Sequence, residues 1–399
     1  MSAHPDGRSG HRPPPAPWLI FSITLTGIAA NPLISPSIPD ILDGLGASAG
    51  SAGLLIGALT LPGIVLAPVI GLLADRYGRR EVLVPCLVLF GISGGLGAAA
   101  PSVGALIVLR FLQGIGSAGL VNLAVVLIGD HWEGVERVRM IGRNAAVLTL
   151  SLALFPVLGG ALTDLFGWRA PFLVYPLALL TAWLLVRRLP RSLSREVSVW
   201  EQVAEAIPIL RSPALLGVLG ASAATFALIF GVVLTVLPLY LETRFGLPAS
   251  WRGVLLGLPA VANFTAAVNL GRLSAHFGRR LLLAAAAGAF VAALVLVAVA
   301  GTLSWLVVGL LGFGLGEGLM VPTLQEVATG AAPASSRGTI VATFVSSARL
   351  GQTLGPIGAA ASLHALGPAT TFVLGAGLAA VMLAAFSFGA RAGPAGRVA

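Results

Sequence analysis

Apolar positions along the chain fall into twelve long runs separated by short polar breaks. The first six runs cover residues 17–39, 50–74, 82–100, 103–129, 141–163 and 168–186, and the second six cover 214–240, 252–274, 281–300, 303–328, 339–363 and 368–390. A membrane-spanning helix needs roughly 20 predominantly apolar residues, which is close to the length of each run. The breaks are rich in Arg, Asp, Gly and Pro, which end helices and form turns. The pattern therefore predicts an all-α membrane protein with 12 transmembrane helices.

The second series of runs repeats the first at a constant shift of 200 residues. Matches at this shift include segments 71–80 and 271–280, Gly114 and Gly314, and Pro156 and Pro356. One register kept over so many runs predicts two pseudo-symmetric six-helix bundles, and such a pair forms a central cavity near the bilayer midplane. The predicted organisation is a disordered cytoplasmic tail at 1–16, bundles at 17–186 and 214–390, a cytoplasmic linker at 187–213, and a second cytoplasmic tail at 391–399.

Composition and charge agree with a chain that has lipid as its solvent. Mean hydropathy is +0.95, hydrophobic residues make up 57% and charged residues 10%, which is too much apolar surface for a soluble core of this length. The net charge of +9 does not predict a nucleic-acid partner, because the arginines lie in the short breaks. With the N-terminus inside, 19 arginines fall on the inner side and three on the outer side. This bias predicts a multi-pass protein of a bacterial inner membrane with both termini in the cytoplasm.

Three motifs carry a resemblance to a known family. Segment 71–80 reads Gly-x-x-x-Asp-Arg-x-Gly-Arg-Arg, the fourth run contains Arg110-Phe-Leu-Gln113-Gly114-Ile-Gly116, and the fifth contains Pro156-Val-Leu-Gly159-Gly160, with Phe155 where a Gly is usual. In these motifs the chain resembles the major facilitator superfamily, and most of all its 12-helix drug:proton antiporters. The resemblance covers nearly the whole chain and implies a monomer that works by alternating access.

The first motif is expected to form a gate between the two bundles. Gly71 and Gly78 permit close packing and a tight turn, and the resemblance implies that Asp75 faces the positive N-terminus of helix 11. Arg76 is predicted to pair with Asp130. Arg79 and Arg80 are interpreted as topological anchors. The alternative is that the whole motif serves membrane topology only.

Three charged residues are predicted to lie inside the membrane, where charge is costly and usually functional. Arg110 shares a helical face with Gln113, and the resemblance ties this Arg to proton coupling; the alternative is a side chain that extends toward the outer headgroups. Glu317 lies near the middle of the tenth run, where a lone carboxyl is expected to be partly protonated, and it is the candidate proton site or cation contact. The alternative for Glu317 is a structural ion pair with Arg349 or Arg110.

Further side chains are candidates for lining the substrate cavity: Asn31, Asn122, Asn263, Phe313, Met320 and Gln352. The first run carries no acid within the membrane, which does not favour a cationic substrate. No metal site is predicted, because His276 and His364 lack partners at ligand spacing. No cofactor is predicted either, and a proton gradient is the expected energy source.

The leading hypothesis is a proton-coupled exporter of small hydrophobic or drug-like compounds, with the lipid bilayer and protons as its other partners. The nearest alternative is an importer or a sugar or metabolite exporter of the same superfamily. A receptor or scaffold that does not transport is a third possibility. An enzyme is disfavoured, because no nucleophile–base or metal spacing is visible.

Overall fold

The computed structural model describes residues 15–190, 212–330 and 337–388. Its first half contains α1 Pro17–Ala29, η1 Ser35–Ser37, α2 Ile38–Gly44, α3 Ser51–Thr60, α4 Gly63–Tyr77, α5 Arg79–Leu96, η2 Gly97–Ala99, α6 Val103–Ser117, α7 Leu120–His131, α8 Gly134–Phe166, η3 Ala170–Val174 and α9 Leu177–Arg188. Its second half contains α11 Pro213–Ala227, η4 Leu228–Val236, α12 Leu237–Phe245, α13 Ala249–Val299, α14 Leu303–Gly330 and α15 Arg337–Phe388. Most of the predicted linker and nearly all of both predicted tails lie outside the described residues.

The helices account for twelve membrane crossings. Among the described residues, nine helical stretches are long and apolar enough to cross a membrane. Two of them, α13 and α15, reverse direction at Gly278 and Gly367, so each supplies two crossings. The short elements α1, η1 and α2 together supply the remaining crossing. The predicted fold class, an all-α membrane protein, is confirmed.

Four glycines with positive φ mark equivalent chain reversals. Gly78 and Gly278 have φ of 102° and 71°, and Gly167 and Gly367 have φ of 83° and 81°. Only glycine adopts this backbone region without a steric penalty. The members of each pair are 200 residues apart, and Gly78 and Gly167 show the same separation as Gly278 and Gly367. The repeat found in the sequence is therefore also a repeat of backbone geometry, and each half itself consists of two related three-helix units.

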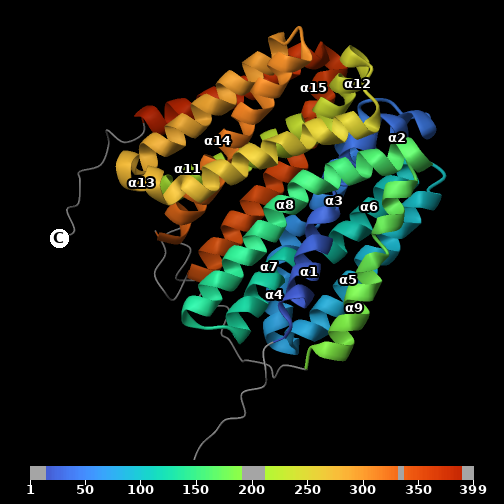
Figure 1. Cartoon of the computed structure of the whole chain (residues 1–399), viewed down its shortest axis with the longest axis vertical. Helices are drawn as coiled ribbons and strands as arrows, with labels where there is room; N and C mark the ends of the chain where they lie inside the picture. The colour runs from blue at the N-terminus through green and yellow to red at the C-terminus, as the bar shows by residue number, and fades with distance from the viewer. Residues whose placement is uncertain (1–14, 191–211, 331–336, 389–399) are drawn as a thin grey trace, which may run out of the picture.

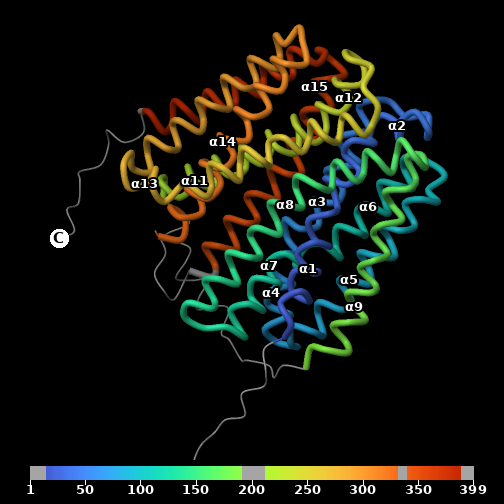
Figure 2. The backbone as a smooth tube through the Cα atoms, in the orientation of Figure 1, coloured from blue at the N-terminus to red at the C-terminus, as the bar shows by residue number. Residues whose placement is uncertain are grey.

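The two halves lie side by side (Figures 1 and 2), and each has its own apolar core. Phe90 anchors the first and Phe290, 200 residues later, the second; both are 1% exposed or less. The halves meet along α3 with α15 and along α8 with α13. At one end, α2 of the first half lies against α12 of the second. We call this the far end, with Asp40, Asp164 and Arg252, and the opposite end, with Arg79, Arg188 and Arg279, the arginine-rich end.

One helical segment departs from the predicted regular helix. Leu228–Val236, nine residues long, is a π-helix between α11 and α12. Its hydrogen-bond pattern is visible at its end, where the backbone N–H of Leu237 donates to the carbonyl of Val232 five residues earlier. Such wide turns are uncommon and often occur at functional positions. The sequence pattern alone does not distinguish this turn from an α-helix.

Candidate functional site

The first buried charge, Arg110, is held entirely by neutral oxygens. It lies on α6 and is 1% exposed. Its Nε donates to the carbonyl of Leu55 at 3.3 Å, and its Nη1 donates to the carbonyl of Ala30 at 2.9 Å and to Gln113 Oε1 at 2.8 Å. Nη2 donates to Asn31 Oδ1. The side chain therefore points into the first bundle, and the alternative of extension toward the outer headgroups is wrong.

This arrangement joins several helices through one guanidinium. The acceptors come from α3, from α6 and from the chain between α1 and η1, and the hydroxyl of Tyr175 donates to the same Ala30 carbonyl at 2.7 Å. A glycine leaves room for it, because a Cβ on Gly94 would lie 2.5 Å from Gln113 Nε2. A buried cation is tolerated only when its donors are satisfied. Arg110 thus links several helices through its hydrogen bonds. Any role in proton coupling would act through its side-chain partners Gln113 and Asn31.

Glu317 is the one acidic residue near the middle of the second bundle. It lies on α14 between Gly316 and Gly318, both of which pack tightly against neighbouring backbone carbonyls. The side-chain amide of Asn263 on α13 provides its hydrogen bond. Within the described part of the chain, no ion pair joins Glu317 to Arg349 or Arg110, so the predicted structural ion pair is not formed here. A carboxyl held by a neutral amide is able to gain and lose a proton without breaking a salt bridge.

Arg349 lies where the two halves cross. It is partly buried on α15, and its Nη1 donates to Gln352 Oε1 at 3.1 Å. Its chain passes over Gly63 of the first half, where an added Cβ would lie 3.2 Å from both Cδ and Nε. One turn along, Thr353 and Thr60 share a hydrogen bond of 2.9 Å between the halves. Arg349, on the second half, therefore lies against the first half.

The six residues predicted to line the substrate cavity lie in different environments. Asn31 and Gln352 are buried beside Arg110 and Arg349, and Asn263 is partly buried beside Glu317. Asn122 is exposed on α7. Phe313 and Met320 are 2% and 0% exposed within the second core, where Phe313 packs on Phe290 with ring centroids 4.7 Å apart. The prediction that Phe313 and Met320 line an open cavity is therefore wrong, since both fill the core.

The 71–80 motif forms an ion-pair cluster at the arginine-rich end, but with a different arginine from the one predicted. Arg79 pairs with Asp75 at 2.5 Å and with Asp130 at 3.0 Å. Arg76 instead lies over the ring of Tyr77. The predicted Arg76–Asp130 pair is wrong because the chain reverses at Gly78 and α5 begins at Arg79, directing that side chain back toward α7. Arg79 is consequently more than a topological anchor.

Arg80 and the second copy of the motif repeat this arrangement. Arg80 donates to the carbonyl of Leu189 at 3.2 Å. In the second half, Arg279 pairs with Glu326 at 2.7 Å, and Arg280 donates to the carbonyl of Phe386 at 2.9 Å. The loss of the Asp-Arg pair in segment 271–280 therefore leaves the arginine contacts in place. The described ion pairs of each cluster join residues of the same half.

The fifth-run motif brings the two halves into backbone contact. A Cβ on Gly160 would lie 2.1 Å from the carbonyl oxygen of Ala249, and one on Gly253 would lie 2.2 Å from that of Pro156. Gly159 makes the same kind of approach to Leu33 within the first half. The symmetric contact is also present, because a Cβ on Gly53 would lie 2.3 Å from the carbonyl oxygen of Pro356. These glycines close the interface at the far end, since no larger residue fits.

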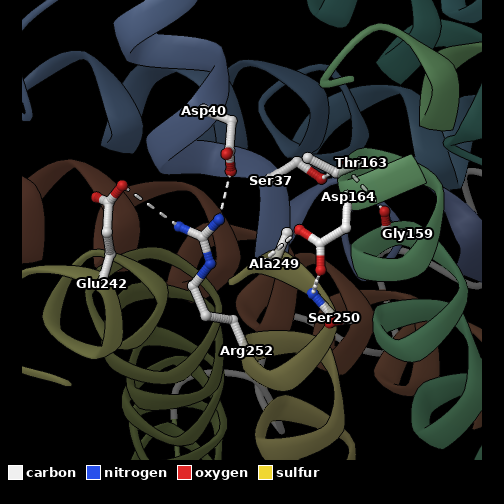
Figure 3. A network of polar contacts seen from close by, with 9 residues as sticks. All are labelled: Ser37, Asp40, Gly159, Thr163, Asp164, Glu242, Ala249, Ser250 and Arg252. Atoms are coloured by element: carbon white, nitrogen blue, oxygen red, sulfur yellow. Dashed lines mark hydrogen bonds and ion pairs between the residues drawn. The ribbon is translucent and has the colours of Figure 1, made fainter. Parts of the chain in front are cut away.

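A polar network also joins the halves at the far end (Figure 3). The two carboxylate oxygens of Asp164 accept from the backbone N–H groups of Ala249 and Ser250, each at 2.9 Å. These groups are the unpaired donors at the N-terminus of α13, where a negative charge is favourable. Asp164 thus caps a helix of the other half.

Arg252 forms the second part of the network. It is 2% exposed, pairs with Asp40 of the first half, and lies 3.8 Å from Glu242 of its own half. Nearby, the hydroxyl of Ser35 donates to the carbonyl of Leu234 at 2.5 Å across the interface. Removal of the acids would leave the buried guanidinium of Arg252 poorly solvated, whereas the two acids are each 36% exposed.

Sequence reasoning missed Asp164 and Arg252, although one signal was available for the former. Gly160-x-x-x-Asp164-x-x-Gly167 repeats the pattern Gly71-x-x-x-Asp75-x-x-Gly78. Arg252 was counted only as an outer-side arginine. Nothing in its sequence neighbourhood indicates that it is buried.

The fold and these sites define a multi-pass helical membrane protein of two related halves, joined at one end and carrying isolated charges at its centre. The family model of the Major Facilitator Superfamily matches residues 18–356 and, in a second match, 249–399. The chain belongs to the Major Facilitator Superfamily, and the resemblance inferred from its motifs is confirmed.

Curated relatives are similar over part of their length. The chain is 31% identical to the bacillibactin exporter of Bacillus subtilis over 160 residues, which is 38% of this chain and 40% of the relative. It is 30% identical to the chloramphenicol resistance protein CraA of Acinetobacter baumannii over 173 residues, 43% of this chain and 41% of that one. These matches span less than half of the relatives' own length.

Solved structures share the fold over nearly the whole chain. The nucleoside transporter NupG superposes with a TM-score of 0.75 at 12% identity, covering 92% of this chain and 99% of that one. A bacterial homologue of the human lysosomal transporter Spinster, in an inward-facing, occupied conformation, superposes with a TM-score of 0.76 at 18% identity, covering 94% and 96%. At these identities the likeness concerns the fold.

Proposed function

We propose that the protein is a secondary active transporter that exports small, largely apolar compounds in exchange for protons. The observation that carries this proposal is the asymmetry of the interface between the halves. At the far end, Asp164, Arg252 and the close-packed glycines bind one half to the other. At the arginine-rich end, the ion pairs of Arg79 and Arg279 each stay within one half. Among the described residues, the polar contacts between the halves gather at the far end, apart from the Thr60–Thr353 hydrogen bond, and such an interface is suited to rocking about a central site.

The orientation of the asymmetry follows from charge. The arginine-rich end is the cytoplasmic side by the positive-inside rule, so this conformation is closed toward the outside. In the opposite conformation the far-end network opens, and Asp75 takes the role that Asp164 has here. The two acids occupy equivalent places in the Gly-x-x-x-Asp-x-x-Gly repeat, 89 residues apart. Counting the same 89 residues from Ala249 leads to the start of α15 as the partner of Asp75.

Proton coupling is assigned to Glu317. Its carboxyl has a neutral partner and lies near the centre of α14, so protonation changes the local charge without competing with an ion pair. A bound proton drives the cycle only if the two conformations bind it with different affinities. The names of the curated relatives, a bacillibactin exporter and a chloramphenicol resistance protein, support export rather than uptake.

The test is transport in proteoliposomes across an imposed pH gradient. Efflux substrates are first screened with the wild-type protein, and Glu317→Gln is then expected to lose the response to the gradient while keeping binding and folding. Glu136→Gln is the matched control, because Glu136 is an exposed acid paired with Arg139 at the arginine-rich end. A wild-type response to the gradient in Glu317→Gln would remove Glu317 from the mechanism. Gradient-independent equilibration by the wild type would replace exchange with facilitated diffusion.

A further inference from the structure

The guanidinium of Arg349 has hydrogen-bond donors that the protein does not use. A guanidinium offers five N–H groups, and within the described residues Arg349 uses one of them, toward Gln352 Oε1. No described carboxylate lies within ion-pair distance of it. Because Arg349 is only partly buried and lies at the crossing of the halves, its remaining donors stay available.

Arg110 provides an internal comparison. It also lies within a membrane-spanning helix, but its three nitrogens donate to four neutral oxygens and it is 1% exposed. The protein has therefore built a complete set of acceptors for one central arginine and has not done so for the other. A cation left with free donors in a low-dielectric setting attracts an anionic acceptor strongly.

Glu317 does not serve as the counterion of Arg349. Its carboxyl is held by Asn263 on α13, and no ion pair between Glu317 and Arg349 exists in the described structure. The positive charge of Arg349 is therefore not cancelled locally. An anionic ligand completes this charge balance, whereas a cationic ligand worsens it.

An apolar groove of about 300 Å³ lies beside the same face of α15. Thr353 and Ile357 line it, and they follow Arg349 at intervals of four residues, which places all three on one helical face. The opposite walls come from α3 and α6 and include Leu54, Leu61, Ile107 and Phe111. The groove thus places an apolar surface one helical turn from a cation with free donors.

We propose that Arg349 binds the oxyanion of the transported compound and that the groove beside Thr353 holds its apolar body. The substrate class is then amphiphilic organic anions, a statement that rests on the proposed transport function. The planar guanidinium forms paired hydrogen bonds to a carboxylate or another oxyanion. Gln352 accepts from Nη1 through its Oε1 and so orients the guanidinium, leaving its own amide nitrogen to donate to the anion.

The experiment measures binding with three probes of one shape and different charge. Naphthalene-1-carboxylate, naphthalene-1-carboxamide and 1-naphthylmethylammonium are titrated into the purified full-length chain, and the thermal unfolding midpoint is followed. The carboxylate is expected to stabilise the wild type at concentrations at least tenfold lower than the other two probes. Arg349→Gln is expected to remove this preference, and Arg349→Lys is expected to retain part of it because the charge remains.

The matched control is Arg188→Gln, which removes an exposed arginine at the end of α9 and is expected to bind like the wild type. The inference is overturned if Arg349→Gln keeps the carboxylate preference, or if the wild type does not prefer the carboxylate. If Arg349→Gln unfolds, Arg349→Lys decides, since an affinity for carboxylate equal to that of the carboxamide in this variant contradicts the inference.

Transport separates this inference from the function on which it rests. Carboxylate binding that depends on Arg349, without transport driven by a pH gradient, would refute the proposed exchange and leave the anion site intact. Gradient-driven export of the ammonium probe that is unchanged in Arg349→Gln would refute the anion site and leave the transporter intact.

Discussion

The two ends of this molecule carry the same kinds of residues, acids and arginines, but these residues pair between the halves at one end and within a half at the other. At the far end, an acid of one half caps a helix of the other, and an arginine of one half pairs with an acid of the other. At the arginine-rich end, Arg79 pairs with Asp75 and Asp130, which belong to the same half. The same Gly-x-x-x-Asp-x-x-Gly pattern precedes both arrangements. The same motif therefore joins the two halves at one end and forms contacts within one half at the other, depending on which residues lie beside its Asp.

The largest expected effect comes from fixing the interface covalently. Thr60 and Thr353 lie on opposite halves with their hydroxyls 2.9 Å apart, and Cys86 is the single native cysteine. In a Cys86→Ser background, Thr60→Cys with Thr353→Cys is expected to oxidise to a disulfide and abolish transport, because the halves can no longer separate there. Reduction should restore the activity. Each single cysteine serves as the control, and full transport by the oxidised double variant would show that the halves do not part at this point.

Breaking the buried ion pair is expected to have the next largest effect. Arg252→Ala leaves Asp40 and Glu242 without their cation, and removal of one partner of a buried pair costs roughly 3–5 kcal/mol. Both acids are 36% exposed and regain water, so the closed far end should lose less than this. A single cysteine at the far end is then expected to react faster with a membrane-impermeant thiol reagent. Asp40→Asn in the same background should add little further, since its partner is already gone.

A sharper comparison uses the two equivalent acids. Asp164→Asn weakens the cap on α13 by about 0.5–2 kcal/mol and should shift the population toward the conformation open at the far end. Asp75→Asn should shift it the opposite way, because the proposed mechanism has Asp75 cap α15 in that other conformation. Thiol accessibility at the two ends measures both shifts. A shift of the population in the same direction in both variants would contradict the equivalence of Asp164 and Asp75.

The smallest expected effect concerns the cluster at the arginine-rich end. Arg79→Ala removes pairs whose acids are 40% and 42% exposed, so the loss of stability is about 0.2–1 kcal/mol. Arg76→Ala should cost less still, since Arg76 is exposed and its contact within the described residues is with the neighbouring ring of Tyr77. Thermal unfolding of the two variants side by side provides the measurement. A larger loss of stability in Arg76→Ala than in Arg79→Ala would support the Arg76–Asp130 ion pair that the sequence alone predicts.

Much of the fold follows directly from the sequence, and the reasons are physical. Apolar runs of spanning length have to become helices in lipid, where every backbone polar group needs an internal partner. The glycines at 78, 167, 278 and 367 reverse the chain at the breaks between runs, as expected for residues that tolerate positive φ. The isolated charges at 110, 317 and 349 were identified for the same reason, because a charge within an apolar run is conspicuous.

The partners of these charges could not be predicted in the same way. Arg76 and Arg79 are three residues apart, and only the backbone turn at Gly78 decides which of them reaches Asp130. The burial of Arg252 depends on how the two halves close, a long-range property with no local pattern. The fates of Phe313 and Met320 were missed because an apolar side chain of a spanning helix faces core, lipid or cavity with the same sequence signature.

The central claim is that the two ends open alternately. Distances between spin labels test it directly, with one exposed pair at the far end, Ser48 and Thr243, and one at the arginine-rich end, Val138 and His276. When pH or substrate shifts the conformation, the far-end distance is expected to lengthen while the other shortens, with Asp164→Asn enlarging the shift. Two distances that rise together, or a far-end distance that stays fixed under every condition that supports transport, would contradict the account.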